Sequence, residues 1–155
     1  MGVPPLEPRE ARSEMATTRS ATTIWRGSLM EGAGRVELES SGLGGFDVTW
    51  ASRAEDPAGR TSPEELIGAA HSSCFSMALS NALAKAGTPP GTLETKAEVT
   101  FQPGEGITGI HLTVRGEVPG MTPEEFADAA EAAKIGCPVS QALAGTTITL
   151  TATLA

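Results

Sequence analysis

The most constraining feature of this 155-residue chain is the segment 62–86, whose two ends carry strong helix signals. Ser62 is the expected N-cap, Pro63 takes the first helical position and Glu65 closes a capping box. Gly87 follows the segment and ends the helix. Between these ends, apolar residues fall on nearly every side, as in a helix that is buried all round. A domain of this size rarely surrounds such a helix alone, so a partner subunit is the expected cover.

Strand patterns flank this helix on both sides, as alternating or β-branched residues bounded by glycine-rich turns. The expected strands cover residues 21–26, 35–39, 46–51, 92–101, 109–118 and 146–154. A second capped helix begins after Thr122 and runs to Gly136, and a short helical segment follows Pro138. The resulting order, β-β-β-α-β-β-α-(α)-β, predicts an α+β fold with antiparallel sheets, a long central buried helix and no repeated βαβ unit.

Charge and composition narrow the organisation and the partners. Residues 1–17 are rich in Pro, Glu and Arg and read as a disordered lead-in, which leaves 18–155 as a single domain. The formal net charge of −8 and the lack of a Lys/Arg cluster argue against nucleic acid and anionic membranes as partners. No membrane span or secretory signal is recognisable, so a cytoplasmic location is expected. In that reducing compartment two cysteines are more often free or redox-active than structural.

The two cysteines, Cys74 and Cys137, occupy different kinds of position. Cys74 lies near the middle of the long helix, where a buried and inert thiol is the ordinary case. To react there, it needs a positive side chain brought from elsewhere to lower its pKa. Cys137 precedes Pro138 and is the expected N-cap of a short helix, where backbone N–H groups favour a thiolate. On position alone, Cys137 is the better-placed nucleophile, and a buried helix cap is the inert alternative.

Two histidines leave further readings open. His71 shares a helix face with Cys74, and it could be a base, a partner to a carbonyl, or a satisfied half-buried side chain, which is the expected reading. A zinc site formed by both cysteines, His71 and His111 lacks the short ligand spacing of such sites, so no metal or other cofactor is expected. A Cys/His pair also suggests a cysteine hydrolase, but no oxyanion-type motif supports one.

Two segments read together sharpen the functional prediction. They are SPEELIGAAHSSCFSMAL at 62–79 and GCPVSQAL at 136–143. Both resemble the cysteine motifs of the osmotically inducible protein C and organic hydroperoxide resistance superfamily (OsmC/Ohr), and the resemblance covers about residues 20–155. The AAHSSCF and CPVS forms are similar to the osmotically inducible (OsmC) branch. The resemblance implies the α+β fold of that family and an intertwined homodimer with active sites at the subunit interface.

The resemblance also implies an activity and its residues. The chain is expected to be a thiol-dependent peroxidase that reduces alkyl or lipid hydroperoxides to alcohols in oxidative stress defence. Cys74 is then the peroxidatic cysteine, which becomes a sulfenic acid, and Cys137 is the resolving cysteine that forms a disulfide with it. An external thiol, either a dithiol or a lipoylated protein, is expected to reduce that disulfide.

The family also places an arginine near its peroxidatic thiol. Arg53, at the end of the third strand region, matches that arginine, with Arg60 in the following loop as the weaker candidate. The family glutamate that holds this arginine falls on Glu64. Because Glu64 and Cys74 are ten residues apart on one helix, about 15 Å separates them along its axis. We therefore expect Glu64 and Arg53 to serve Cys74 of the partner subunit.

Two other classes of function remain compatible with the sequence. A redox-responsive sensor or binding protein would use the same disulfide switch without turnover, because it also needs a reactive thiol beside a resolving one. A structural domain with two inert buried cysteines is the third reading.

Overall fold

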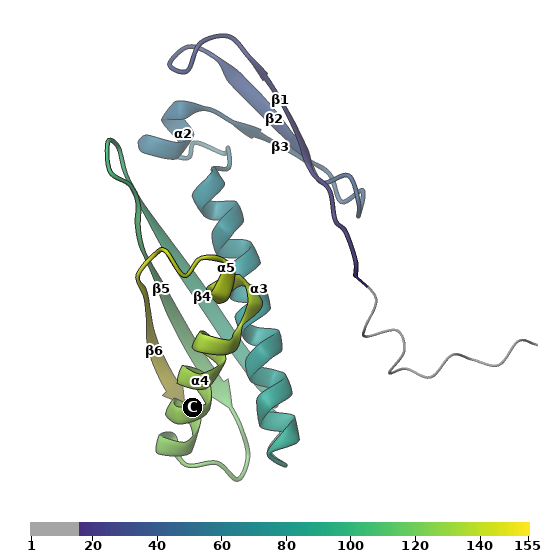
Figure 1. The fold of residues 1–155 in the computed structure, drawn as a ribbon, viewed down its shortest axis with the longest axis vertical. Helices are drawn as coiled ribbons and strands as arrows, with labels where there is room; N and C mark the ends of the chain where they lie inside the picture. Colours follow the sequence, from purple (N-terminus) through teal and green to yellow (C-terminus); the bar gives the residue numbers. More distant parts are fainter. Residues whose placement is uncertain (1–15) are drawn as a thin grey trace, which may run out of the picture.

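The computed structural model describes residues 16–155 and contains two three-stranded sheets and four helices in that range (Figure 1). The first sheet holds β1 (Thr22–Arg26), β2 (Ala33–Glu37) and β3 (Gly45–Val48), and the second holds β4 (Thr92–Gln102), β5 (Gly106–Glu117) and β6 (Ile148–Leu154). The helices are α2 (Trp50–Ala54), α3 (Pro63–Lys85), α4 (Pro123–Gly136) and α5 (Pro138–Ala142). The predicted α+β class is confirmed. The predicted lead-in at 1–17 lies almost wholly outside the described residues.

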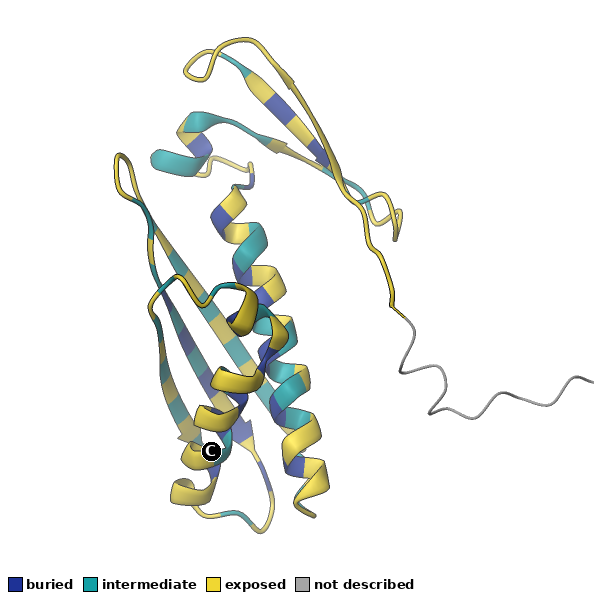
Figure 2. Ribbon diagram, viewed as in Figure 1, coloured by how far each residue is buried: buried dark blue, intermediate teal, exposed yellow. Residues whose placement is uncertain are grey.

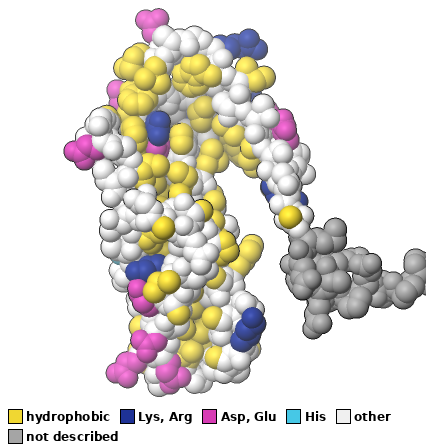
Figure 3. Space-filling model, in the orientation of Figure 1, with side chains coloured by type: hydrophobic (Ala, Val, Ile, Leu, Met, Phe, Trp, Pro, Cys, Tyr) yellow, Lys and Arg dark blue, Asp and Glu magenta, His cyan; other side chains and the backbone are white. Residues whose placement is uncertain are grey.

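The first sheet stands apart from the rest of the chain. Its strands are antiparallel in the order β1-β2-β3 and project from one end of α3 (Figure 1). Most of its surface is exposed, and hydrophobic side chains gather on it beside the hollow that separates it from the body (Figures 2 and 3). These large exposed side chains are Ile24, Trp25, Leu29, Met30, Leu43 and Phe46. Such a surface is typical of a part of the protein that another chain covers.

The helix α3 begins and ends as its sequence predicts. The Ser62 hydroxyl accepts a hydrogen bond from the backbone N–H of Glu65 at 3.1 Å. The predicted capping box is only half formed, because the Glu65 carboxylate instead accepts a hydrogen bond from the Thr61 hydroxyl. At the other end Gly87 adopts φ +88°, a conformation that glycine reaches without strain.

Only one side of α3 is buried by its own chain. Phe75, Leu79 and Leu83 are fully buried against the second sheet and α4. The opposite side is exposed in a single chain, and it carries Ala69, Ala70, Ser73 and Met77. The partner subunit that would cover this second side stays a prediction.

The second sheet corrects one expectation about strand direction. Strands β4 and β5 are antiparallel, but β6 pairs with β5 in parallel. The chain leaves β5, passes through α4 and α5, and returns to the same end of the sheet, which is how a helical crossover makes neighbouring strands parallel. The prediction of antiparallel sheets without a parallel unit was therefore wrong for this edge. Alternation of residues predicts a strand but not its direction.

The hydrophobic core lies between this sheet and the helices α3 and α4 (Figure 2). Its fully buried members include Phe75, Leu112, Val114, Phe126 and Cys137. One of the two cysteines is therefore part of the core itself.

A short unpredicted helix replaces the end of the third strand. Thr49 and Ser52 each hydrogen-bond the other's backbone N–H through their hydroxyls, at 3.0 Å in both directions, and this capping box begins α2. The strand predicted at 46–51 therefore ends at Val48, and Arg53 lies on a helix. Within the described residues, no helix has the length and apolar character needed to cross a membrane.

Candidate active site

The fold brings the two cysteines into direct contact. Cys74 is partly buried in the middle of α3, and Cys137 is fully buried as the N-cap of α5. The backbone N–H of Cys137 donates to the carbonyl of Ala133 in the last turn of α4, which anchors the cysteine at the junction of the two helices. The thiols share a side-chain hydrogen bond, through which each alters the pKa of the other.

The environment of Cys74 does not favour its thiolate within a single chain. Burial raises the pKa of the Cys74 thiol, and its hydrogen bond with Cys137 raises it further. The backbone N–H of Val139 acts in the opposite direction but does not prevail. None of the causes of this shift is a positive side chain. A single chain therefore holds Cys74 as a thiol that donates its proton toward Cys137.

The environment of Cys137 does favour a thiolate. Burial alone would raise the pKa of Cys137, but hydrogen bonding outweighs it and the pKa is lowered. The favourable groups are the backbone N–H of Ser140, the Cys74 thiol, the Ser140 hydroxyl and the backbone N–H of Val139. This direction agrees with the position of Cys137 at a helix N-terminus, where N–H groups have no partner within the helix.

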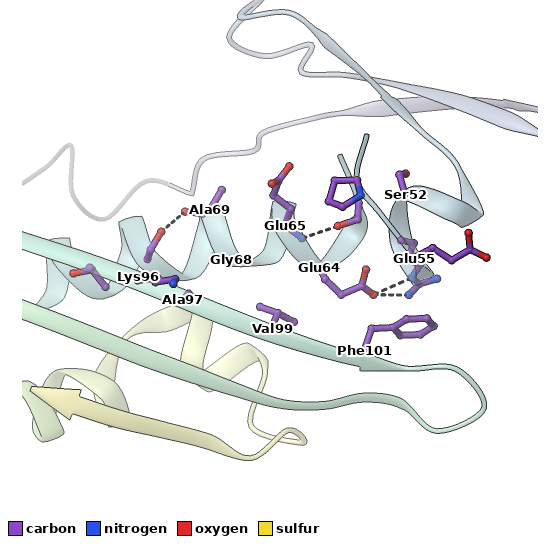
Figure 4. A pocket seen from close by; sticks show the side chains of 15 residues that line it. Ser52, Glu55, Glu64, Glu65, Gly68, Ala69, Lys96, Ala97, Val99 and Phe101 are labelled. Atoms are coloured by element: carbon purple, nitrogen blue, oxygen red, sulfur yellow. Dashed lines mark hydrogen bonds and ion pairs between the residues drawn. The ribbon is translucent and has the colours of Figure 1, made fainter. Parts of the chain in front are cut away.

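Arg53 and Glu64 form an ion pair at one end of α3, where Figure 4 labels Glu64 beside Phe101. The Nε and Nη2 atoms of Arg53 lie 2.9 and 2.8 Å from the same carboxylate oxygen, Oε1 of Glu64. The guanidinium carbon lies 4.1 Å from the centre of the Phe101 ring, so the cation also rests on an aromatic face. Both guanidinium nitrogens thus contact the same carboxylate oxygen, and Oε2 of Glu64 is buried without a partner among the described residues.

The ion pair and the cysteines lie at different levels of α3. Glu64 is in its first turn and Cys74 near its middle, about 15 Å further along the axis. A single chain therefore keeps the two sulfurs and the Arg53–Glu64 ion pair apart. Arg60, the alternative arginine, borders a separate hollow beside Asp47 and Glu65 and is not paired with Glu64.

The two histidines differ from the sequence reading and from each other. His71 is fully buried, with Nε2 lying 2.7 Å from the Ser140 hydroxyl and Nδ1 without a partner, so the expectation of a half-buried satisfied side chain was wrong. His111 lies on β5 and hydrogen-bonds Thr149 and Thr151 of β6. Throughout residues 16–155, no three His, Cys, Asp or Glu side chains cluster as a metal site requires.

A largely apolar hollow opens beside Arg53. It measures about 460 Å³ and lies between the first sheet, α2 and the start of α3. Its lining includes Trp25, Leu29, Val36, Trp50 and Leu66. The sequence offered no signal for this hollow, because its walls come from segments that are far apart in the chain.

Comparison with known proteins identifies the family. A family model described as OsmC-like protein matches residues 55–152. The chain belongs to this family. Among curated proteins, an OsmC-like relative from Escherichia coli (strain K12), named peroxiredoxin OsmC, is 43% identical over 132 residues, which is 83% of this chain and 92% of the relative. A relative of the same name from Shigella flexneri matches equally well.

Solved structures of OsmC-like and organic hydroperoxide resistance proteins share the fold. A Legionella pneumophila organic hydroperoxide resistance protein OsmC aligns with a TM-score of 0.67 at 22% identity, covering 90% of this chain and 99% of that one. An organic hydroperoxide resistance protein from Elizabethkingia anophelis aligns with a TM-score of 0.64 at 27% identity, covering 92% of this chain and 98% of that one.

Proposed function

We propose that this protein is a thiol-dependent peroxidase that reduces organic hydroperoxides, with Cys74 as the attacking thiol and Cys137 as the resolving thiol. The observation that carries the proposal is the direct contact of two thiols from distant parts of the chain. Membership of a family whose E. coli relative is named a peroxiredoxin supports the same activity.

The proposed reaction uses the two thiols of the protein, the hydroperoxide and an external dithiol reductant. The Cys74 thiolate attacks the outer oxygen of the hydroperoxide, so an S–O bond forms, the O–O bond breaks and the alcohol leaves after taking up a proton. Cys74 is then a sulfenic acid. The Cys137 thiolate attacks that sulfur, a disulfide forms and hydroxide leaves. A dithiol reductant restores both thiols by exchange and is itself oxidised to a disulfide.

The charge that Cys74 needs is proposed to come from a second copy of the chain. Only a thiolate attacks peroxide, and within one chain burial raises the pKa of Cys74 while no cation among residues 16–155 opposes it. Arg53 is a permanent cation held by Glu64, but about 15 Å along the helix from Cys74 in its own chain. Two antiparallel copies of α3 would place this pair beside Cys74 of the partner subunit.

The exposed side of α3 fits such a helix pair. If Glu64 of one copy faces Cys74 of the other, Ala69 lies midway and faces its own counterpart. Ala69, Ala70 and Ser73 are small and exposed in the single chain, so two helices can approach closely there. A partner helix on this side would bury the rest of α3, as expected for a helix that is apolar on nearly every side.

The apolar hollow beside Arg53 supports an organic substrate. An alkyl or aryl group gains free energy by leaving water for such walls, roughly 25 cal/mol per Å² of apolar surface, and hydrogen peroxide has no group that does so. With its peroxide end near the guanidinium, an organic hydroperoxide can occupy this hollow while the partner's thiol attacks.

The test is turnover of cumene hydroperoxide with dithiothreitol as reductant. We expect the protein to turn over, Cys74→Ser to abolish turnover, and Cys137→Ser to slow it strongly, because without a resolving thiol Cys74 stays a sulfenic acid until dithiothreitol reduces it directly or further hydroperoxide oxidises it. Hydrogen peroxide serves as the comparison substrate and should react more slowly. Disulfide formation without turnover would favour the sensor reading, and unchanged consumption by Cys74→Ser would refute the assignment.

The partner's role is testable by mixing two inactive variants. Cys74→Ser retains Arg53, and Arg53→Ala retains Cys74. In a hybrid dimer, the Cys74 of the second variant lies beside the Arg53 of the first, so random exchange should restore about a quarter of the native turnover. If Arg53 acted within its own chain, the mixture would stay as inactive as the separate variants.

A further inference from the structure

A buried histidine near the cysteine pair, His71, has no role in the proposed peroxidase reaction. His71 is fully buried on α3, and its Nε2 lies 2.7 Å from the hydroxyl of Ser140, which is only 5% exposed. Its other ring nitrogen, Nδ1, is buried and has no partner. Burial lowers the pKa of His71, so the ring is neutral at physiological pH. A neutral imidazole has one N–H and one bare nitrogen.

The unpartnered nitrogen indicates which tautomer is present. Buried N–H groups without a partner are rarer in proteins than buried acceptors without one. The bare nitrogen of His71 is therefore Nδ1, and Nε2 carries the hydrogen and donates it to the Ser140 oxygen. The Ser140 hydroxyl then keeps its own hydrogen for a second acceptor. Ser140 lies in the first turn of α5, three residues after Cys137, and its hydroxyl is close enough to the Cys137 side chain to lower the pKa of that thiol.

We infer that His71 and Ser140 are positioning residues that prepare Cys137 for the resolving step. The hydrogen-bond chain runs from Nε2–H of His71 to the Ser140 oxygen, and from the Ser140 hydroxyl to the Cys137 sulfur. The inference rests on the proposed function, because the resolving step exists only in a two-cysteine peroxidase.

The resolving step explains why such a chain is useful. The Cys137 thiolate attacks the Cys74 sulfenic acid, an S–S bond forms, the S–O bond breaks and hydroxide leaves. A fully buried thiolate is costly unless hydrogen-bond donors surround it. Ser140 donates without losing its proton. His71 fixes the direction of the Ser140 hydroxyl. Because Nε2 of His71 donates its hydrogen to the Ser140 oxygen, it cannot also accept the hydroxyl hydrogen, which is left to point toward Cys137.

No charged side chain near Cys137 offers a competing explanation among the described residues. From α3 the titratable groups facing it are Cys74 and His71. On α4 the nearest cation, Lys134, is paired with Glu131 at 2.7 Å. The inward side chains of β5 are apolar, namely Ile110, Leu112 and Val114.

The direct experiment is a titration of Cys137 in the full chain carrying Cys74→Ser, which leaves one thiol. Thiolate absorbance at about 240 nm is followed against pH. The chain has no tyrosine, so no phenolate absorbs in this window. We expect Ser140→Ala to raise the midpoint by about one pH unit, which is about a tenfold loss of thiolate below the midpoint.

Two further variants separate hydrogen bonding from packing. Ser140→Thr keeps the hydroxyl and should restore the midpoint of the Cys74→Ser background. His71→Phe keeps a ring but removes the donor, and should raise the midpoint in the same direction. It also carries the test if Ser140→Ala fails to fold, as judged by circular dichroism. An unchanged midpoint in both Ser140→Ala and His71→Phe, or an equal shift in Ser140→Thr, would overturn the inference.

A kinetic measurement with both cysteines present completes the test. After one equivalent of cumene hydroperoxide, stopped-flow tryptophan fluorescence should show the resolving step slowed about tenfold in Ser140→Ala, with the first step unchanged. The titration does not involve peroxide, so failure of this inference can be told from failure of the proposed function. A shifted midpoint in a protein without turnover would support the hydrogen-bond chain and reject the peroxidase activity. Normal turnover with an unshifted midpoint would reject the hydrogen-bond chain alone.

Discussion

Glu64 carries a buried carboxylate with only one of its two oxygens partnered in its own chain. We expect Glu64→Gln to lower kcat/KM for cumene hydroperoxide by about tenfold to a hundredfold, because the neutral amide holds Arg53 less firmly beside the reacting thiol. The matched control is Glu65→Gln, a neighbouring exposed carboxylate, which should keep native kinetics. Equal losses in the two variants would contradict a specific role for Glu64.

The burial of His71 predicts a dependence of stability on pH. Its pKa is lowered in the folded protein from 6.5, so below pH 6.5 the unfolded chain binds a proton that the folded chain does not. The stability contribution of the neutral ring is therefore complete above 6.5 and is lost as pH falls toward the lowered value. In urea unfolding, His71→Gln should lose less stability on acidification than the native protein.

The other histidine provides the control for this measurement. His111→Gln changes a residue of the sheet surface that bonds two threonines. We expect it to keep the native loss of stability on acidification. If both substitutions had the same effect, the dependence could not be assigned to the buried ring.

At the residue scale, the sequence was informative where a motif was long and uninformative where contacts come from packing. The cysteine segments could be read directly, and both thiols meet in the structure. Ser140 has no such signal, because a serine in the turn after Cys-Pro is also an ordinary helix residue. Its importance depends on His71 reaching it across two helices, and only the packing of α3 against α5 decides that.

At the scale of elements, Gly116 on β5 lies directly against Phe126 of α4. A Cβ atom there would lie 2.6 Å from Cζ of Phe126 and 3.1 Å from Cδ2 of Leu93. We expect Gly116→Ala to lower the free energy of unfolding by about 1–3 kcal/mol, because the aromatic ring must shift within a packed core. Urea denaturation measures the change.

The same strand offers a matched control for that substitution. A Cβ atom at Gly109 would meet only the carbonyl of Thr147, at 3.6 Å, which is ordinary contact. Gly109→Ala should therefore stay within about 0.5 kcal/mol of the native protein. A similar cost in both variants would mean that strand glycine itself, and not the Phe126 contact, sets the stability.

Element boundaries were predictable where caps are explicit. Ser62 and Thr122, each followed by proline, predicted the starts of α3 and α4. The boundary at Thr49 was not predictable. A threonine before tryptophan favours a strand in isolation, and Thr49 begins a helix only because its hydroxyl and that of Ser52 each hydrogen-bond the other's backbone N–H. The parallel course of β6 was likewise out of reach, since pairing direction depends on where the crossover returns.

For the whole molecule, the proposed mechanism requires two chains at each active site. A negative charge at Ala69 should oppose its own copy across an antiparallel helix pair. We expect Ala69→Glu to shift the protein from dimer to monomer in sedimentation velocity and to lower peroxide turnover by at least about tenfold. Ala84→Glu, also exposed on α3 but far from the crossing, should remain a native-like dimer.

The projecting first sheet belongs to the same whole-molecule question. Its exposed hydrophobic side chains, which gather on the sheet in Figure 3, and the exposed side of α3 are both left uncovered by the described residues of a single chain. The sequence predicted a partner from the apolar character of α3 and from the family resemblance. It did not predict the exposed sheet, because the strand patterns of these segments are also those of strands that are half-buried within one chain.

The most direct measurement is peptide mapping after one equivalent of cumene hydroperoxide is added to the fully reduced protein. Non-reducing mass spectrometry should recover a single cross-link that joins Cys74 to Cys137 within one chain, with both free thiols lost. Hydroperoxide consumption that leaves both thiols reduced, or cross-links found only between chains, would contradict the two-thiol mechanism.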